Sequence, residues 1–315
     1  MAAITTPPPI PGTPIDPPVK GPPKMLKEQT GFVGIAYRAF SRFSFAKASL
    51  LAAGTTYYLF LAMFAVLAFG YGVAAAFGTD QFAAQLTDAL DEALPGLVGA
   101  DGIDPAQLRA TGRASSVVGL LLLLYSGGGA MVAASDSLHL IYGAPPDPRS
   151  FVKARVRLLG WLVIIAPLIL LSFSIPAFVA SVAGGSQGFL DTTAIPQAVW
   201  IAVALLVVLV IDFGIMYLLL GFLGGIRPER RARVSGAAAG AIGVSVLKYF
   251  LGLIIAWSIA RPQYGAFAMP ITVLFVLFLL TIALYGSAAL AAGIADRGVP
   301  LEHLTPTDIE TDAAT

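Results

Sequence analysis

Six long apolar runs dominate this sequence. A helix rises about 1.5 Å per residue and the hydrocarbon layer of a bilayer is about 30 Å thick, so about 18 or more apolar residues can cross it. Runs of this kind cover about residues 50–77, 115–135, 158–183, 199–224, 236–259 and 267–294. The sequence therefore predicts an all-α polytopic membrane protein with six transmembrane helices.

The composition agrees with this prediction. Of the 315 residues, 57% are hydrophobic and 12% are charged, whereas a soluble domain carries about 25% charged residues. The absence of cysteine excludes disulfides, thiolate zinc sites, iron–sulfur clusters and cysteine nucleophiles. A net charge of +1 provides no general attraction for a polyanion such as nucleic acid.

Lysine and arginine are concentrated in alternate connections between the apolar runs, and such residues mark the cytoplasmic side. They are Lys20, Lys24, Lys27, Arg38, Arg42 and Lys47 before the first run, Arg149, Lys153, Arg155 and Arg157 after the second, and Arg227, Arg230, Arg231 and Arg233 after the fourth. The other connections carry few positive charges. The distribution predicts that both termini are cytoplasmic.

The apolar region divides the chain into three parts. Residues 1–30 are rich in proline and predict a disordered cytoplasmic tail, which could also offer a PxxP docking site to a partner. Residues 31–297 form the predicted membrane domain, which contains an interfacial helix at 31–47, basic on one side, and an amphipathic external segment at 78–114. Residues 298–315 are predicted to be a short cytoplasmic tail.

Two ionisable residues fall inside predicted spans. Asp212 precedes Arg227, and Lys248 follows Arg233, by the same number of residues, so both lie about 22 Å inward from the cytoplasmic arginines of a helical hairpin. Equal depth allows them to pair, and each charge alone would cost about 2.5 to 3.5 kcal/mol in the bilayer. They predict either a structural ion pair or a polar point on a substrate path.

The first two spans supply the other polar candidates. Asp136 and His139 lie one helical turn apart and form either a proton-handling pair or an interfacial cap at a helix exit. Four hydroxyl-bearing candidates, which line the same interior or bond only to neighbouring helices, are Tyr57, Tyr58, Tyr125 and Ser126. With Asp212 and Lys248, these residues are the predicted substrate-path candidates.

Glycines and prolines indicate where helices touch or bend. Gly236 and Gly240 make a small-xxx-small face, and the glycine run 127–129 thins one side of the second span. Pro167 and Pro176 interrupt the third span and Pro270 the sixth, which predicts either ordinary kinks or the broken helices of an inverted-repeat transporter. The two halves of the chain show no convincing similarity to each other.

Several motifs, in this order, resemble the YihY/BrkB family of bacterial inner-membrane proteins over roughly residues 30–297. They are Ala52-Ala53-Gly54-Thr55-Thr56-Tyr57-Tyr58, then Leu124-Tyr125-Ser126-Gly127-Gly128-Gly129-Ala130 followed by Asp136 and Ile141-Tyr142-Gly143, then Ser150-Phe151, and finally Tyr264-Gly265-Ala266. The chain departs from the family pattern in two places. Phe64 stands where a proline is expected, and the last span, which ends just before Asp296, lacks the acidic residue that is usual at its end. The resemblance implies a multi-pass protein of the bacterial cytoplasmic membrane.

The family carries a virulence or serum-resistance label and an older label of ribonuclease BN, and the residues argue against the nuclease. Metal-dependent cleavage needs clustered ligands, but neither His139 nor His303 has a second histidine or a carboxylate constellation near it in sequence. The cytoplasmic positive charges are those that topology already requires. We therefore expect no enzyme activity, no cofactor, no metal and no nucleic-acid partner.

Two functions remain as hypotheses. The first is a transporter-like or lipid-handling protein that holds an amphiphile at a polar cavity in the helix bundle, with membrane lipids as its partners. It would need a partner to use ATP, because no GxxxxGK[ST] loop is present. The alternative is a noncatalytic scaffold that binds envelope proteins through its tail and basic loops. The sequence predicts neither a substrate nor an oligomeric state.

Overall fold

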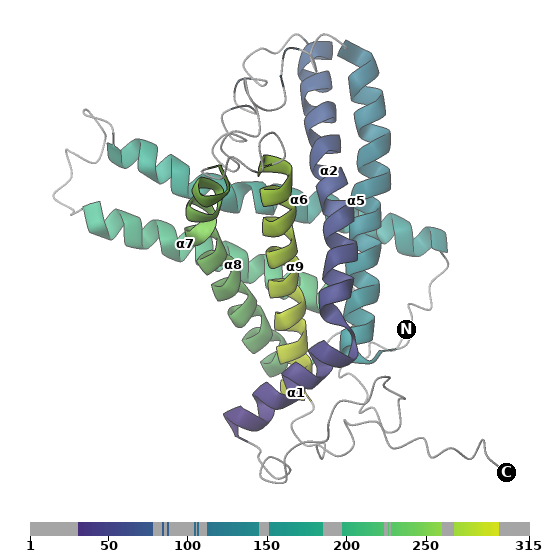
Figure 1. The fold of residues 1–315 in the computed structure, drawn as a ribbon, viewed down its shortest axis with the longest axis vertical. Coiled ribbons are helices and arrows are strands. Elements are labelled where there is room, and N and C mark those ends of the chain that lie inside the picture. Colours follow the sequence, from purple (N-terminus) through teal and green to yellow (C-terminus); the bar gives the residue numbers. More distant parts are fainter. Residues whose placement is uncertain are drawn as a thin grey trace.

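The fold is all-helical in the part of the chain that can be described. The computed structural model describes residues 31–77, 84, 87, 104, 106, 112–144, 151–184, 197–223, 226, 228–259 and 268–295. Its long helices are α1 (Phe32–Phe45), α2 (Ala48–Phe77), α5 (Gly112–Tyr142), α6 (Phe151–Gly184), α7 (Gln197–Leu218), α8 (Arg230–Ile259) and α9 (Ala268–Ala295), and a π-helix η2 (Leu219–Leu223) continues α7 (Figure 1). The predicted all-α class is confirmed for these residues.

Among the described residues, five helices are long and apolar enough to cross a membrane. They are Ala48–Ala76, Ser116–Tyr142, Ala202–Leu223, Arg230–Leu251 and Pro270–Ala295. Five of the six predicted spans overlap them. The sixth, 158–183, lies within α6, which is helical throughout but is not among the five. Six crossings and cytoplasmic termini therefore stay predictions.

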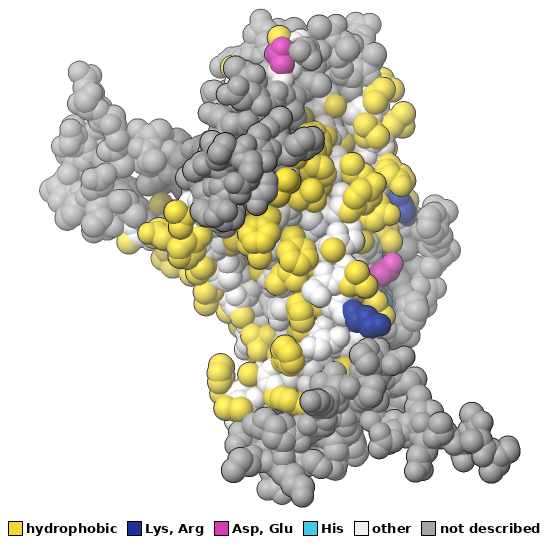
Figure 2. Space-filling view, in the orientation of Figure 1, with side chains coloured by type: hydrophobic (Ala, Val, Ile, Leu, Met, Phe, Trp, Pro, Cys, Tyr) yellow, Lys and Arg dark blue, Asp and Glu magenta, His cyan; other side chains and the backbone are white. Residues whose placement is uncertain are grey.

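The helices form two groups with different directions. In Figure 1, α2, α5 and α9 run along the long axis of the molecule, whereas α6 and α7 lie across it. The visible surface of the described residues is mostly hydrophobic, with few charged side chains (Figure 2). Such a surface suits the lipid environment that the composition predicts.

Small residues let the helices approach closely. A methyl group at Gly119 of α5 would overlap the backbone of Phe69 in α2, so these two helices touch backbone to backbone. On the other side of the bundle, a Cβ at Gly236 would lie 2.7 Å from the carbonyl oxygen of Ser287, and one at Gly240 would lie 2.9 Å from Ser287 Cβ. The predicted small-residue face of α8 is therefore confirmed as its contact with α9.

Helix α1 crosses the end of the bundle where α9 finishes (Figure 1). A Cβ at Gly293 would lie 2.7 Å from the backbone nitrogen of Ala39, which shows how closely α1 packs there. The basic side of α1 faces the protein, because Arg38 and Arg42 are only 3% and 2% exposed. Its outer side carries Phe32, which is 84% exposed. Burial of the arginines leaves an aromatic surface for the membrane interface.

Three helices are longer than the predicted spans, because they continue beyond the apolar runs. Helix α5 extends to Tyr142, and α8 begins at Arg230. Helix α6 begins at Phe151, so Arg155 and Arg157 belong to its first two turns and not to a loop. A helix that projects beyond the hydrocarbon can carry charged residues at its ends. This correction changes the role of Arg155, as described below.

The interpretation of α6 as a broken helix was wrong. The helix runs without interruption from Phe151 to Gly184, through Pro167 and Pro176. A membrane helix tolerates a proline when its surroundings compensate for the missing N–H donor. In α9, Pro270 falls in the first turn, where no intrahelical donor is needed.

Several predictions lie outside the described residues. These are the tails 1–30 and 298–315, which include His303, and most of the external segment 78–114. From that segment, Thr87 is described, and its Oγ1 lies 2.8 Å from the hydroxyl of Tyr71 near the end of α2.

Candidate functional site

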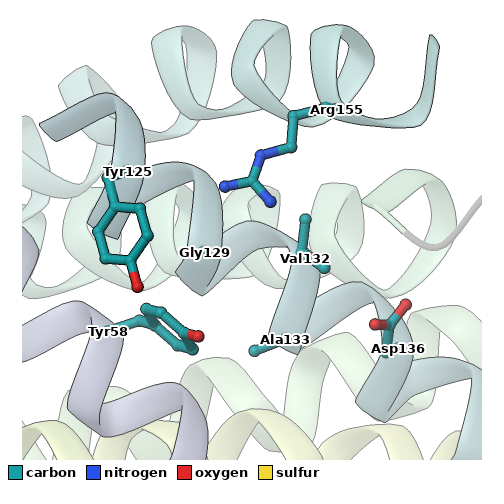
Figure 3. Close-up of a pocket in the computed structure, with 7 residues that line it drawn as sticks. All are labelled: Tyr58, Tyr125, Gly129, Val132, Ala133, Asp136 and Arg155. Carbon is teal, nitrogen blue, oxygen red and sulfur yellow. The ribbon is translucent and has the colours of Figure 1, made fainter. Parts of the chain in front are cut away.

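A cavity of about 280 Å³ lies between α2, α5 and α6. Its lining residues are Tyr58 from α2, Tyr125, Gly129, Val132, Ala133 and Asp136 from α5, and Arg155 from α6 (Figure 3). The α5 residues follow each other at helical spacing and so form one face of that helix. This cavity combines a cation, an anion and two phenols.

The glycine run of α5 creates the room for this cavity. A Cβ at Gly129 would lie 2.5 Å from Cδ1 of Tyr58, so only glycine permits the observed place of that ring. A Cβ at Gly128 would lie 3.6 Å from Nε of Arg155, and one at Gly127 would lie 2.9 Å from Cδ2 of Leu162. The run therefore lets α6 approach α5 and brings Arg155 to the cavity.

Two tyrosines form the aromatic part of the cavity. The rings of Tyr58 and Tyr125 make an edge-to-face pair with centroids 6.4 Å apart, an arrangement that suits the ring quadrupoles. The hydroxyl of Tyr125 points toward Tyr58 in Figure 3. Tyr125 is 59% exposed on the outer surface of the bundle. The cavity therefore meets the surface beside a tyrosine.

The charged groups stand at different places along α5. In Figure 3 the guanidinium of Arg155 extends over the glycine run, and Asp136 lies at the end of the lining opposite Tyr125. Asp136 is exposed. One positive and one negative side chain give the lining a formal charge near zero, which sets it apart from a site built for a simple anion.

The structure brings three predicted residues, Tyr58, Tyr125 and Asp136, to one cavity, and the other candidates do not line it. Tyr57 is exposed and contacts Tyr58 edge to face, with ring centroids 5.6 Å apart, but it does not line the cavity. His139 is buried and also does not line it.

The hydroxyl of Ser126 bonds to the backbone of its own helix and does not line the cavity. Its Oγ donates to the carbonyl of Leu122 at 2.6 Å, and Ser137 donates to the carbonyl of Ala133 at 2.6 Å. Both serines are buried. Their hydroxyls satisfy local carbonyls and do not line the cavity.

Asp212 and Lys248 form a second, separate polar cluster. Nζ of Lys248 lies 2.7 Å from Oδ1 of Asp212, as their equal depth predicts. Ser172 of α6 donates to the same carboxylate oxygen at 2.5 Å and accepts from Lys248 at 2.6 Å, while Ser245 donates to Oδ2 at 3.2 Å. Asp212 is 3% exposed. The cluster joins α6, α7 and α8, and hydrogen bonds complete the ion pair.

Two arginines contact the last turn of α7 and the π-helix η2 that follows it. Arg157 of α6 donates to the carbonyls of Phe222 at 3.3 Å and Leu223 at 2.6 Å, which satisfies acceptors at the end of a helix. Arg233 of α8 donates to the hydroxyl of Tyr217, and its guanidinium carbon lies 4.1 Å from the centre of that ring. These two residues act as structural links and stand apart from the cavity.

Arg155 is the cavity residue that sequence reasoning missed, because it was assigned to a cytoplasmic loop. A signal was present: Arg155, Leu159 and Leu162 recur at helical spacing, so they share one face if the helix starts before Arg155. That face packs on the glycine run. Extending the helical period backward from the apolar run would have placed Arg155 on the same face as Leu159 and Leu162, but would not have shown that this face meets α5.

Within the described residues, no three His, Asp or Glu side chains are grouped as metal ligands.

Comparison with known proteins identifies the family. No curated protein and no solved structure gives a significant match to the chain. A family model described as Virulence factor BrkB matches residues 39–308, a range that contains the whole cavity and every described helix from α2 to α9. The chain therefore belongs to the Virulence factor BrkB family and is an integral membrane protein.

Proposed function

We propose that this protein binds an amphiphile from its bilayer at the cavity and carries the polar head of that amphiphile across the membrane. The observation that supports the proposal is a polar-lined cavity between helices of a membrane protein. We place the protein in the bacterial cytoplasmic membrane, and its role is noncatalytic. Binding and movement need no covalent step.

The chemistry of the lining supports a polar ligand. Charged and phenolic side chains that line a cavity among membrane helices usually serve a ligand path or each other, because exposing them to hydrocarbon is costly. The lining contains Arg155, Asp136, Tyr58 and Tyr125. These groups offer guanidinium and hydroxyl donors together with a carboxylate acceptor.

The size of the cavity favours a head group over a whole lipid. Sites that enclose a complete small molecule measure about 300 to 1,000 Å³, and this cavity has about 280 Å³. The neighbouring surface is apolar, since Leu121 and Leu124 of α5 are exposed beside Tyr125. The acyl chains can therefore stay in the bilayer while the head enters the protein.

The length of the lining along α5 supports movement of a head group through the membrane. Asp136 lies eleven residues beyond Tyr125 on α5, which corresponds to about 16 Å along the helix axis. That distance is about half of a hydrocarbon layer of about 30 Å. A head group passing along this face would exchange polar contacts over a large part of its path.

Reconstituted vesicles test the proposal. Phospholipids labelled on an acyl chain with a nitrobenzoxadiazole dye are incorporated, and dithionite, which does not cross the bilayer, bleaches only the dye that it can reach. We expect the protein to increase the bleached fraction. Filling the cavity with Ala133→Leu should reduce this effect, whereas Ala202→Leu on the exposed surface of α7 should not. Equal bleaching with and without protein would refute the proposal.

A further inference from the structure

The charges of the cavity point to a particular class of head group. We propose that the cavity selects a zwitterionic amphiphile whose head carries both a phosphate and an amine. This inference rests on the proposed function and specifies its substrate. It depends on the placement of Arg155 and Asp136 along one lining.

The guanidinium of Arg155 is the phosphate-binding group. Guanidinium matches phosphate with parallel N–H donors and is the preferred side chain for that ligand. It extends over the glycine run, where a Cβ at Gly128 would lie 3.6 Å from Nε and 3.7 Å from Nη2. The absence of side chains on α5 at this point lets a ligand oxygen approach the guanidinium closely.

The carboxylate of Asp136 is the amine-binding group, and it also excludes other heads. A head with only a negative charge would be attracted by Arg155 but repelled by the like charge of Asp136. This repulsion is stronger near the bilayer than in water. A head with only a positive charge would be attracted by Asp136 but repelled by Arg155. A head that carries both charges meets an opposite charge at each end.

The spacing of the two groups suits a short zwitterion. Gly128 and Asp136 are eight residues apart on α5, or about 12 Å along its axis. A phosphate and an amine joined by two carbons, each at a hydrogen-bond distance of about 3 Å from its side chain, cover a gap of this order.

The experiment compares two phospholipids on the intact protein. The full chain in a neutral detergent is mixed with equal amounts of phosphatidylethanolamine and phosphatidylglycerol that have the same acyl chains, and retained lipids are counted by native mass spectrometry. We expect phosphatidylethanolamine to be retained in about fivefold excess, the ratio that a single partly exposed charge contact supports. A preference for phosphatidylglycerol, or no preference, would overturn the inference.

Charge variants locate the selectivity. Asp136→Asn should shift the retained ratio toward phosphatidylglycerol, because it leaves only the positive charge of Arg155. Arg155→Gln should lower the retention of both lipids. Lys153→Gln is the matched control, since Lys153 is exposed on the same turn of α6 and does not line the cavity. An unchanged ratio in Asp136→Asn at normal folded yield would overturn the inference.

Soluble competitors distinguish a complete head from a simple phosphate. Phosphoethanolamine should displace labelled phosphatidylethanolamine at lower concentration than inorganic phosphate does. Equal displacement by the two would overturn the inference, because phosphate alone would then suffice. Retention of no lipid of either kind would instead refute the proposed function, so the two failures are distinguishable.

Discussion

Two groups of helices, α2 with α5 and α9, and α6 with α7 and α8, are joined by different polar contacts. In the group of α2, α5 and α9, two neutral hydroxyl contacts join α2 to α9: Thr55 meets the hydroxyl of Tyr285 at 2.5 Å, and Thr56 donates to Thr281 at 3.4 Å. In the group of α6, α7 and α8, the central contact is charged, with Lys248 2.7 Å from Asp212. The cavity lies where α6 of the second group approaches α2 and α5 of the first.

This difference predicts different sensitivities. A hydroxyl contact between membrane helices contributes about 0.6 kcal/mol on average and about 1.7 kcal/mol at most. Removing one member of a buried ion pair costs about 3 to 5 kcal/mol, because the other charge stays buried. The charged group should therefore fail after one substitution, whereas the neutral group should tolerate loss of a hydroxyl but not loss of a glycine.

The largest expected effect is in the charged group. Lys248→Met leaves the carboxylate of Asp212 buried beside two serines and should lower the free energy of unfolding by about 3 to 5 kcal/mol. The double variant Asp212→Asn/Lys248→Met should recover part of this loss. Folded yield by size-exclusion chromatography and unfolding in detergent measure both, with the exposed Lys153→Met as control. Additive losses would show that the two groups are energetically independent.

The next largest effect is expected in the group of α2, α5 and α9, where an added methyl group overlaps a neighbouring side chain. Gly129→Ala places a methyl group 2.5 Å from the present position of Tyr58 Cδ1, so the ring must move, at a cost of about 1 to 3 kcal/mol. Gly160→Ala is the matched control, because nothing lies within 4 Å of a Cβ there. Thermal unfolding checks the prediction. Equal stability of the two variants would mean that Tyr58 adapts freely.

These contacts show which features of the molecule could be predicted from the sequence. The positions of five spans follow from local apolar runs, and the pairing of Asp212 with Lys248 follows from distance to the helix ends along the chain. Both features depend chiefly on depth, which the pairing needs together with a suitable rotation of the two helices. Depth is encoded locally, because each residue advances the helix by a fixed rise.

Features that depend on rotation and tertiary approach could not be predicted in this way. Asp136 and His139 are separated by three residues, or about 60° around α5, yet one lines the cavity and the other is buried away from it. Which side faces the neighbours depends on how α2 and α6 pack. Arg155 was missed for the same reason, since its role requires the start of α6 and the glycine run together.

A smaller effect tests the hydroxyl contacts of the neutral group. Thr55→Val removes the hydrogen bond to Tyr285 while keeping the shape of the side chain, and should cost about 0.6 to 1.7 kcal/mol. A double-mutant cycle with Tyr285→Phe isolates the coupling between the two hydroxyls. Unfolding free energies of the four proteins supply the measurement. A coupling as large as that of the ion pair would erase the distinction between the two groups.

The smallest expected effect is removal of residues 1–30, which precede α1 and contain the proline-rich segment. Both groups of helices and the cavity consist of residues beyond Gly31, so a chain that begins at Gly31 keeps every contact described above. Its unfolding free energy and its dithionite bleaching in vesicles should equal those of the full chain. The scaffold alternative makes the opposite prediction for cells, because a scaffold that binds envelope proteins through the tail loses them with it. If the shortened chain reached normal abundance and bleached labelled lipid normally, yet failed to restore envelope resistance to a strain lacking the gene, the tail and not the cavity would carry the cellular function.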